Sequence, residues 1–181
     1  MSLMQKIRLF VSDKRASVSV EAVMVFPLLF WAYFGMFILF DGYRAMAANN
    51  RAAYTISDLI SRETNAITPE YMEGLNDMLD ILTQSQYRTV LRVTVASYNA
   101  TTDDHTMVWS YSTEGQDAIT TGNFDDEIVQ YLPPMPDGGV LVAVETWMGY
   151  VPFSSIALDS FYFESMVTIR PRFAGQLVFE S

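Results

Sequence analysis

The chain contains no cysteine and only one histidine among its 181 residues. The absence of cysteine excludes disulfide bonds, thiolate nucleophiles and cysteine-bound metal ions. His105 has no partner at a spacing typical of a metal site or a catalytic triad, and we expect it to be a surface residue. The acidic run 125–127 lacks the spacing of an EF-hand calcium loop and is expected to be a solvated helix start. Glycine-rich phosphate loops and the G-x-S-x-G motif are also missing. We therefore expect no enzymatic activity, no cofactor and no metal.

Basic residues are scarce outside the N-terminal region. The chain has 11 basic and 21 acidic residues, for a net charge of −10. Residues 1–40 carry four basic and two acidic side chains, whereas residues 41–181 carry seven basic and nineteen acidic ones. Neutralisation of nucleic-acid phosphates requires a basic protein surface. The acidic character of residues 41–181 therefore argues against nucleic acid as a partner.

An uncharged apolar run covers residues 22–40. As a helix it is about 28 Å long, close to the roughly 30 Å hydrocarbon core of a bilayer. A secretory signal usually has a shorter apolar region, which favours a permanent membrane span, although Ala45-Met46-Ala47 resembles a signal-peptidase site. Pro27 lies inside the run, where a mild kink is tolerated. Basic residues before the run predict a cytoplasmic N-terminus and an external body.

Helical periodicity continues beyond the apolar run. Met46, Ala53, Ile56 and Ile60 form one stripe, so we predict a single long helix over residues 17–62, transmembrane in its first half and amphipathic in its second. Thr68-Pro69-Glu70 has the residue types of a helix start, and the second helix is expected to end near residue 85.

Strand patterns dominate the rest of the chain. Alternating or β-branched stretches predict four strands, and residues 124–132 are expected to form a short helix. The predicted strands are Thr89–Tyr98, Thr106–Ser112, Val140–Tyr150 and Phe161–Arg170. The expected fold class is α+β, with a long N-terminal transmembrane and amphipathic helix, a second helix and an antiparallel sheet of about four strands. The expected division is a cytoplasmic leader (1–16), a transmembrane helix (17–42) and an extracytoplasmic α+β domain (43–181).

Glu21 directly precedes the first residue of the apolar run. A charged side chain inside a bilayer costs roughly 2.5–3.5 kcal/mol at its centre and less near an end, so a compensating partner is expected. A basic leader, a small residue, a glutamate five residues further on and a long apolar helix resemble the class III signal peptides of pilins and pseudopilins. The similarity is closest to TadE-like pseudopilins of tight-adherence (Tad) pili, whose apolar span also contains a proline. The segments 150–152 and 166–172 resemble the C-terminal strands of such proteins.

This resemblance implies a pilin-like fold and a non-enzymatic role as a minor pseudopilin in assembly of a Tad-type (type IVb) pilus. A prepilin peptidase would cut between Ala16 and Ser17, where the family usually has glycine before the cut. Glu21 would then pair with the new amine of a neighbouring subunit's Ser17. Ala22 replaces the tyrosine of major Tad pilins, which favours a minor subunit.

The resemblance also implies a location and partners. The protein would cross the bacterial inner membrane once, with a periplasmic domain. Its incorporation into the pilus as one of the subunits stays open. Its partners would be the peptidase, other Tad pilus subunits and inner-membrane assembly proteins. Two alternatives stay open: an uncleaved single-pass protein whose acidic periplasmic domain binds a partner of the secretion apparatus, and a membrane-tethered enzyme. The mature N-terminus distinguishes the first alternative from the pseudopilin.

Overall fold

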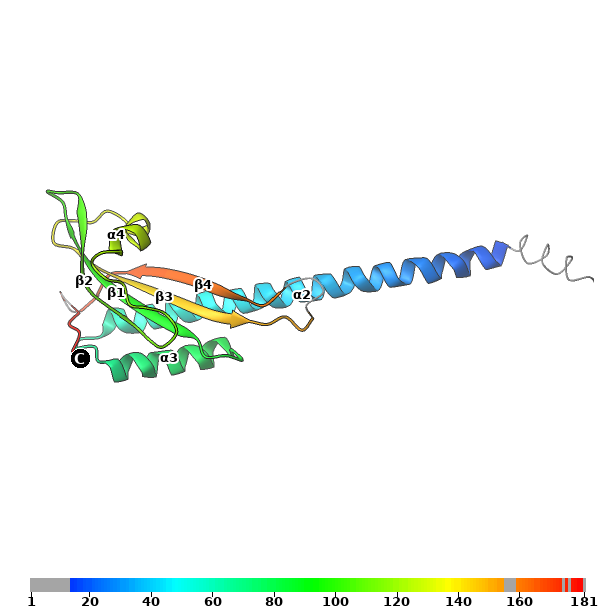
Figure 1. Cartoon of the computed structure of the whole chain (residues 1–181), viewed down its shortest axis with the longest axis horizontal. Helices are drawn as coiled ribbons and strands as arrows, with labels where there is room; N and C mark the ends of the chain where they lie inside the picture. The colour runs from blue at the N-terminus through cyan, green and yellow to red at the C-terminus, as the bar shows by residue number, and fades with distance from the viewer. Residues whose placement is uncertain (1–13, 155–158, 174, 176, 181) are drawn as a thin grey trace, which may run out of the picture.

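The computed structural model describes residues 14–154, 159–173, 175 and 177–180, with side chains from residue 20 onward. It confirms the predicted α+β architecture. A long N-terminal helix runs along a four-stranded antiparallel sheet, with a second helix beside it (Figure 1). The N-terminal part of the long helix projects far beyond the sheet, so the protein consists of a domain and a projecting helix (Figure 1).

Helix α2 (Lys14–Arg62) is continuous over 49 residues, as the sequence predicted for residues 17–62. At 1.5 Å per residue it is about 70 Å long. Pro27 lies inside it without interrupting the helical assignment. The predicted apolar stripe is confirmed for Ala53, Ile56 and Ile60, which are fully buried, but Met46 is 43% exposed. Met46 therefore lies off the face of α2 that packs on the domain, although α2 already contacts the domain at Gly42.

Helix α3 (Pro69–Thr83) begins as predicted. The Thr68 hydroxyl accepts a hydrogen bond from the backbone N–H of Tyr71 at 3.2 Å, and this N-cap satisfies one of the free donors of the first turn. The helix ends where Gln84 adopts a left-handed conformation, with φ of 53°. Between these two ends, helix α3 packs beside the C-terminal part of α2 (Figure 1).

The sheet has the strand order β2-β1-β3-β4, and every neighbouring pair is antiparallel. Its strands are β1 (Val90–Asn99), β2 (Asp104–Ser112), β3 (Val140–Tyr150) and β4 (Phe161–Ile169). All four were predicted to within two residues at either end. The central strands β1 and β3 pair through Val93 and Val144. These two strands carry most of the buried residues of the sheet.

One face of the sheet packs against α2 and α3. The alternate residues Leu91, Val93 and Val95 of β1 point to this face, as the strand pattern predicted, and all are nearly or fully buried. They join a single apolar core with Ile56 of α2 and Leu79 of α3. Burial of a large aliphatic side chain contributes about 1.5–3 kcal/mol, so this core fixes both helices to the sheet.

The opposite face is covered by the segment between β2 and β3. It contains α4 (Phe124–Glu127) and a 3-10 turn, η1 (Val129–Tyr131), with Ile128 buried between them. The sequence predicted one helix over residues 124–132. The helix stops earlier because Ile128 leaves helical geometry, with φ of −121°. This segment forms a second apolar cluster with the sheet, so the domain has three layers.

Candidate functional site: the projecting helix

Most apolar side chains of the projecting part of α2, residues 20–40, are exposed, whereas Ile38 is buried at 3% exposure. Phe26, Trp31 and Phe40 are 59%, 69% and 70% exposed. Fully burying one such side chain is worth about 1.5–3 kcal/mol, so leaving this surface in water would cost on the order of 20 kcal/mol. Within the described residues one helix is long and apolar enough to cross a membrane, and it is this one. It has the properties of a membrane span or of a signal sequence.

Glu21 lies at the N-terminal end of this projecting part, and its side chain is exposed. Ala16 and Ser17 belong to the first turn of α2, but their side chains lie outside the part of the chain that the structure describes, as does leader segment 1–13. Residues four apart share a helix face, so the backbone puts Ser17 and Glu21 on the same side of α2, about 6 Å apart along its axis. Any intermolecular partner of Glu21 would approach this end of the helix.

The projecting part joins the domain at Asp41, immediately after the apolar run. The Tyr150 hydroxyl at the end of β3 donates a hydrogen bond to the Asp41 carboxylate at 2.9 Å. Gly42 is buried beneath the Tyr150 ring, where an added Cβ would lie 3.9 Å from ring atoms. Burial, followed by the hydrogen bond and negative charge of Asp41, raises the pKa of Tyr150 to about 12. Tyr150 is therefore neutral and donating at physiological pH.

Asn49 makes a second connection two turns further along α2. Its side-chain amide donates to the Phe163 carbonyl of β4 at 3.3 Å, and its oxygen accepts from the Thr146 hydroxyl of β3 at 3.2 Å. Asn49 and Thr146 are 1% and 0% exposed. Buried polar groups that are satisfied in this way fix the register of the elements that they join. The projecting helix is thus attached to the sheet without an intervening loop. Sequence reasoning missed both connections, because the partners are 97 to 114 residues apart.

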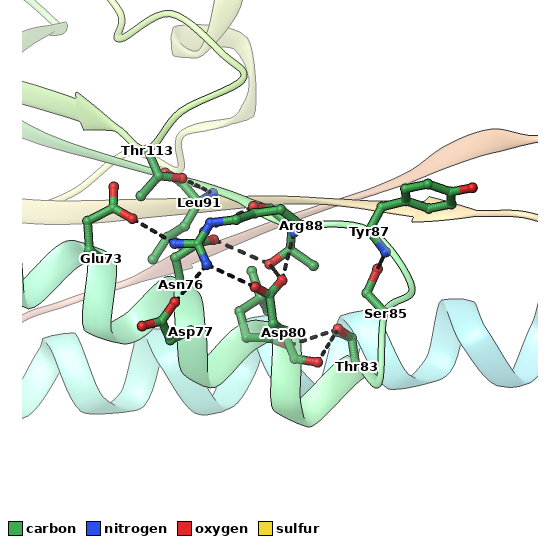
Figure 2. Close-up of polar contacts among 12 residues, drawn as sticks. Glu73, Asn76, Asp77, Asp80, Thr83, Ser85, Tyr87, Arg88, Leu91 and Thr113 are labelled. Atoms are coloured by element: carbon green, nitrogen blue, oxygen red, sulfur yellow. Dashed lines mark hydrogen bonds and ion pairs between the residues drawn. The ribbon is translucent and has the colours of Figure 1, made fainter.

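A cluster around Arg88 connects α3 to the start of β1 (Figure 2). The Arg88 guanidinium contacts Glu73 at 2.8 Å, Asp77 at 2.7 Å and Asp80 at 3.2 Å. The hydrogen bonds that Arg88 donates to Asp77 and then to Glu73 raise the pKa of Arg88. Asp80 also accepts two bonds of 2.7 Å from the backbone N–H and hydroxyl of Thr89. These contacts hold the α3–β1 connection in place, and the acidic side chains are engaged with a cation from the chain itself.

A buried ion pair crosses the face of the sheet that α4 covers. Arg92 of β1 and Glu145 of β3 form a two-pronged contact, with N–O distances of 2.7 and 2.9 Å. The guanidinium also contacts Glu127 of α4 at 3.1 Å and lies 5.0 Å from the centre of the Trp147 ring. Burial lowers the pKa of Arg92. The hydrogen bonds and negative charge of Glu145, together with the charge of Glu127, outweigh this effect, so that the pKa of Arg92 is raised. The pair joins β1 to β3, and the contact of Arg92 with Glu127 joins α4 to the sheet.

His105 differs from its expected surface position. It is 9% exposed, its ring lies 4.8 Å from that of Tyr98, and Nε2 is 3.3 Å from the Pro133 carbonyl oxygen. It is buried because the segment between β2 and β3 folds over the strand edge, which strand periodicity does not indicate. The acidic run 125–127 forms the first turn of α4, as expected. No group of three histidine, aspartate or glutamate side chains able to hold a metal occurs among the residues described.

Comparison of the chain with protein-family models, with curated proteins and with solved structures finds no match in any of the three.

Proposed function

We propose that this protein is a membrane-anchored, non-enzymatic minor pseudopilin that takes part in assembly of a Tad-type pilus. One observation carries the proposal: a single helix supplies both a projecting apolar segment and a core element of an α+β domain. Such a helix suits a subunit that is stored in a membrane and packs through its apolar part with the helices of other subunits. The leader, small residue and glutamate spacing at its N-terminus support the same role.

The proposed location is the inner membrane, with the N-terminus in the cytoplasm and the domain in the periplasm. The basic residues before the apolar run favour this orientation. A phosphatase fused after Ser181 should be active, because that enzyme requires export. A stable, membrane-bound fusion without phosphatase activity would contradict the orientation.

Glu21 is the residue proposed to act in assembly. Removal of the leader before Ser17 would create a free amine, and the amine of one subunit would pair with the Glu21 carboxylate of the next. Pairing offsets much of the cost of a carboxylate in an apolar bundle. The exposed position of Glu21 near the N-terminal end of α2 leaves it accessible to another subunit.

The test uses variants at the proposed cleavage position, Ala16, and at the proposed assembly residue, Glu21. Ala16→Leu should block cleavage by crowding the peptidase site, whereas Ala16→Gly should be cut normally. Glu21→Gln removes the charge and favours insertion, so the protein should stay in the membrane while pilus yield falls. Glu114→Gln, at an exposed glutamate of the domain, is the matched control and should assemble normally.

Normal pili from cells that carry Ala16→Leu or Glu21→Gln alone would contradict the pseudopilin mechanism. That result would favour the uncleaved single-pass protein whose periplasmic domain binds a partner of the secretion apparatus. An immunoblot beside the pilus assay shows whether the leader has been lost.

A further inference from the structure

The end of the domain from which α2 projects carries exposed aromatic and aliphatic side chains. Phe153 is 81% exposed, Val151 is 43% exposed, and Tyr162 at the start of β4 is 69% exposed. On α2 itself, Tyr43 is 72% exposed. The segment that leaves β3 lies at the end of the domain nearest to the projecting part of α2 (Figure 1). We call Tyr43, Val151, Phe153 and Tyr162 the collar.

The collar is fixed at the level where the apolar run ends. Tyr150, directly before Val151, is hydrogen-bonded to Asp41, which directly follows the last residue of the run. Next to this contact, Tyr87, Val151 and Tyr162 line a hollow of about 240 Å³. The collar therefore continues the apolar surface of the projecting helix onto the domain.

Position and residue type together favour a lipid surface as the occupant. Tyrosine and other amphipathic aromatics are enriched where a span leaves the hydrocarbon, because their rings are apolar and their hydroxyls reach the headgroups. Tyr43 and Tyr162 have this character, and Phe153 and Val151 add apolar area. Arg44, also exposed, lies about one turn beyond the end of the apolar run, at the height expected for lipid phosphates. Residues 41–181 are strongly acidic, so a lipid surface would have to be bound through apolar and aromatic side chains and not through general attraction to anionic lipid.

We propose that the collar inserts into the headgroup region of the bilayer that α2 spans, so that the domain rests on the membrane instead of standing away from it. The proposal rests on the membrane span of the proposed function. It assigns a lipid-binding role to residues of the domain, which no part of the pseudopilin mechanism requires. The competing occupant is the domain of a second copy of this chain.

Because the chain has no cysteine, single-cysteine variants can be labelled with a nitroxide at one position. The full chain is reconstituted in vesicles of phosphatidylcholine and phosphatidylglycerol, with labels at Phe153→Cys, Phe173→Cys or Phe34→Cys. Phe173 is the matched control, since it is 71% exposed and follows Arg172, whose N–H donates to Ser61 at the far end of the domain. Electron paramagnetic resonance then measures collisions with apolar oxygen and with a polar nickel chelate.

The label at residue 153 should collide with oxygen severalfold more, relative to the chelate, than the label at residue 173. The ratio of oxygen collisions to chelate collisions at residue 153 should be lower than the ratio at residue 34, which lies inside the proposed membrane span. Equal ratios at 153 and 173, with residue 34 in lipid, would overturn the collar proposal and leave the span intact. Protection of residue 153 from both reagents, with broadening between labels, would identify a second copy and also overturn it. An aqueous ratio at residue 34 would instead contradict the membrane span itself. Tyr162→Cys provides an independent collar position.

Discussion

Replacement of Tyr150 by phenylalanine tests the junction between the projecting helix and the domain. The variant keeps the ring that covers Gly42 and removes only the hydroxyl, which lies 2.9 Å from the Asp41 carboxylate. A hydrogen bond to a charged group contributes about 1.5–3 kcal/mol. We expect Tyr150→Phe to lower the free energy of unfolding by roughly 2 kcal/mol at about pH 8.

The stability that the Tyr150 hydroxyl contributes should decrease at high pH. The pKa of Tyr150 is higher in the folded protein than in the unfolded chain, so its contribution is fully present below pH 10 and is lost as pH rises from 10 to about 12. The difference in stability between wild type and Tyr150→Phe should therefore shrink over that interval. Denaturant unfolding of the full chain in detergent, followed by near-ultraviolet circular dichroism, measures it. Tyr162→Phe, at an exposed tyrosine of the neighbouring strand, should show no such difference.

Equal stability of wild type and Tyr150→Phe at about pH 8 would show that the hydrogen bond to Asp41 adds nothing to the stability of the domain. A difference that stayed constant up to pH 12 would show that the hydroxyl acts other than by donating to Asp41.

Three further changes test the domain by the same unfolding measurement. Glu145→Gln should cost about 3 kcal/mol, the lower end of the range for a broken buried pair, because Glu127 still faces Arg92; an unchanged midpoint would show that the pair adds nothing. Trp147→Ala should cost roughly 3–5 kcal/mol because the ring is only 9% exposed and packs against Arg92; wild-type stability would contradict this packing. Thr68→Ala should cost about 1 kcal/mol by removing the N-cap of α3, and Thr68→Ser should restore it.

The helices and strands that were predicted well are those whose type and bounds are indicated by residues close to them in the sequence. Apolar periodicity gives α2 and β1, and Thr68 with Pro69 gives the start of α3. In each case the signal lies within a few residues of the element that it forms, so no knowledge of distant contacts is needed. The existence and burial of β3 are also indicated locally, because a run of β-branched and aromatic residues is typical of a buried strand.

The features that were missed depend on contacts between distant segments. The segment between β2 and β3 has no strong periodicity, yet it covers one face of the sheet and buries His105. The bond between Tyr150 and Asp41 spans 109 residues, and neither residue is unusual in its local sequence. For the candidate site, the sequence predicted the apolar helix and the position of Glu21 at its end. It did not indicate how firmly this helix is joined to the sheet.

Intact mass and N-terminal sequencing of the protein purified from its native membrane test the pseudopilin proposal most directly. We predict a chain that begins at Ser17, has lost residues 1–16 and fractionates with the inner membrane. The Ala16→Leu variant, purified in the same way, should retain its leader. A full-length wild-type chain, recovered from membranes whose prepilin peptidase is active, would contradict the account.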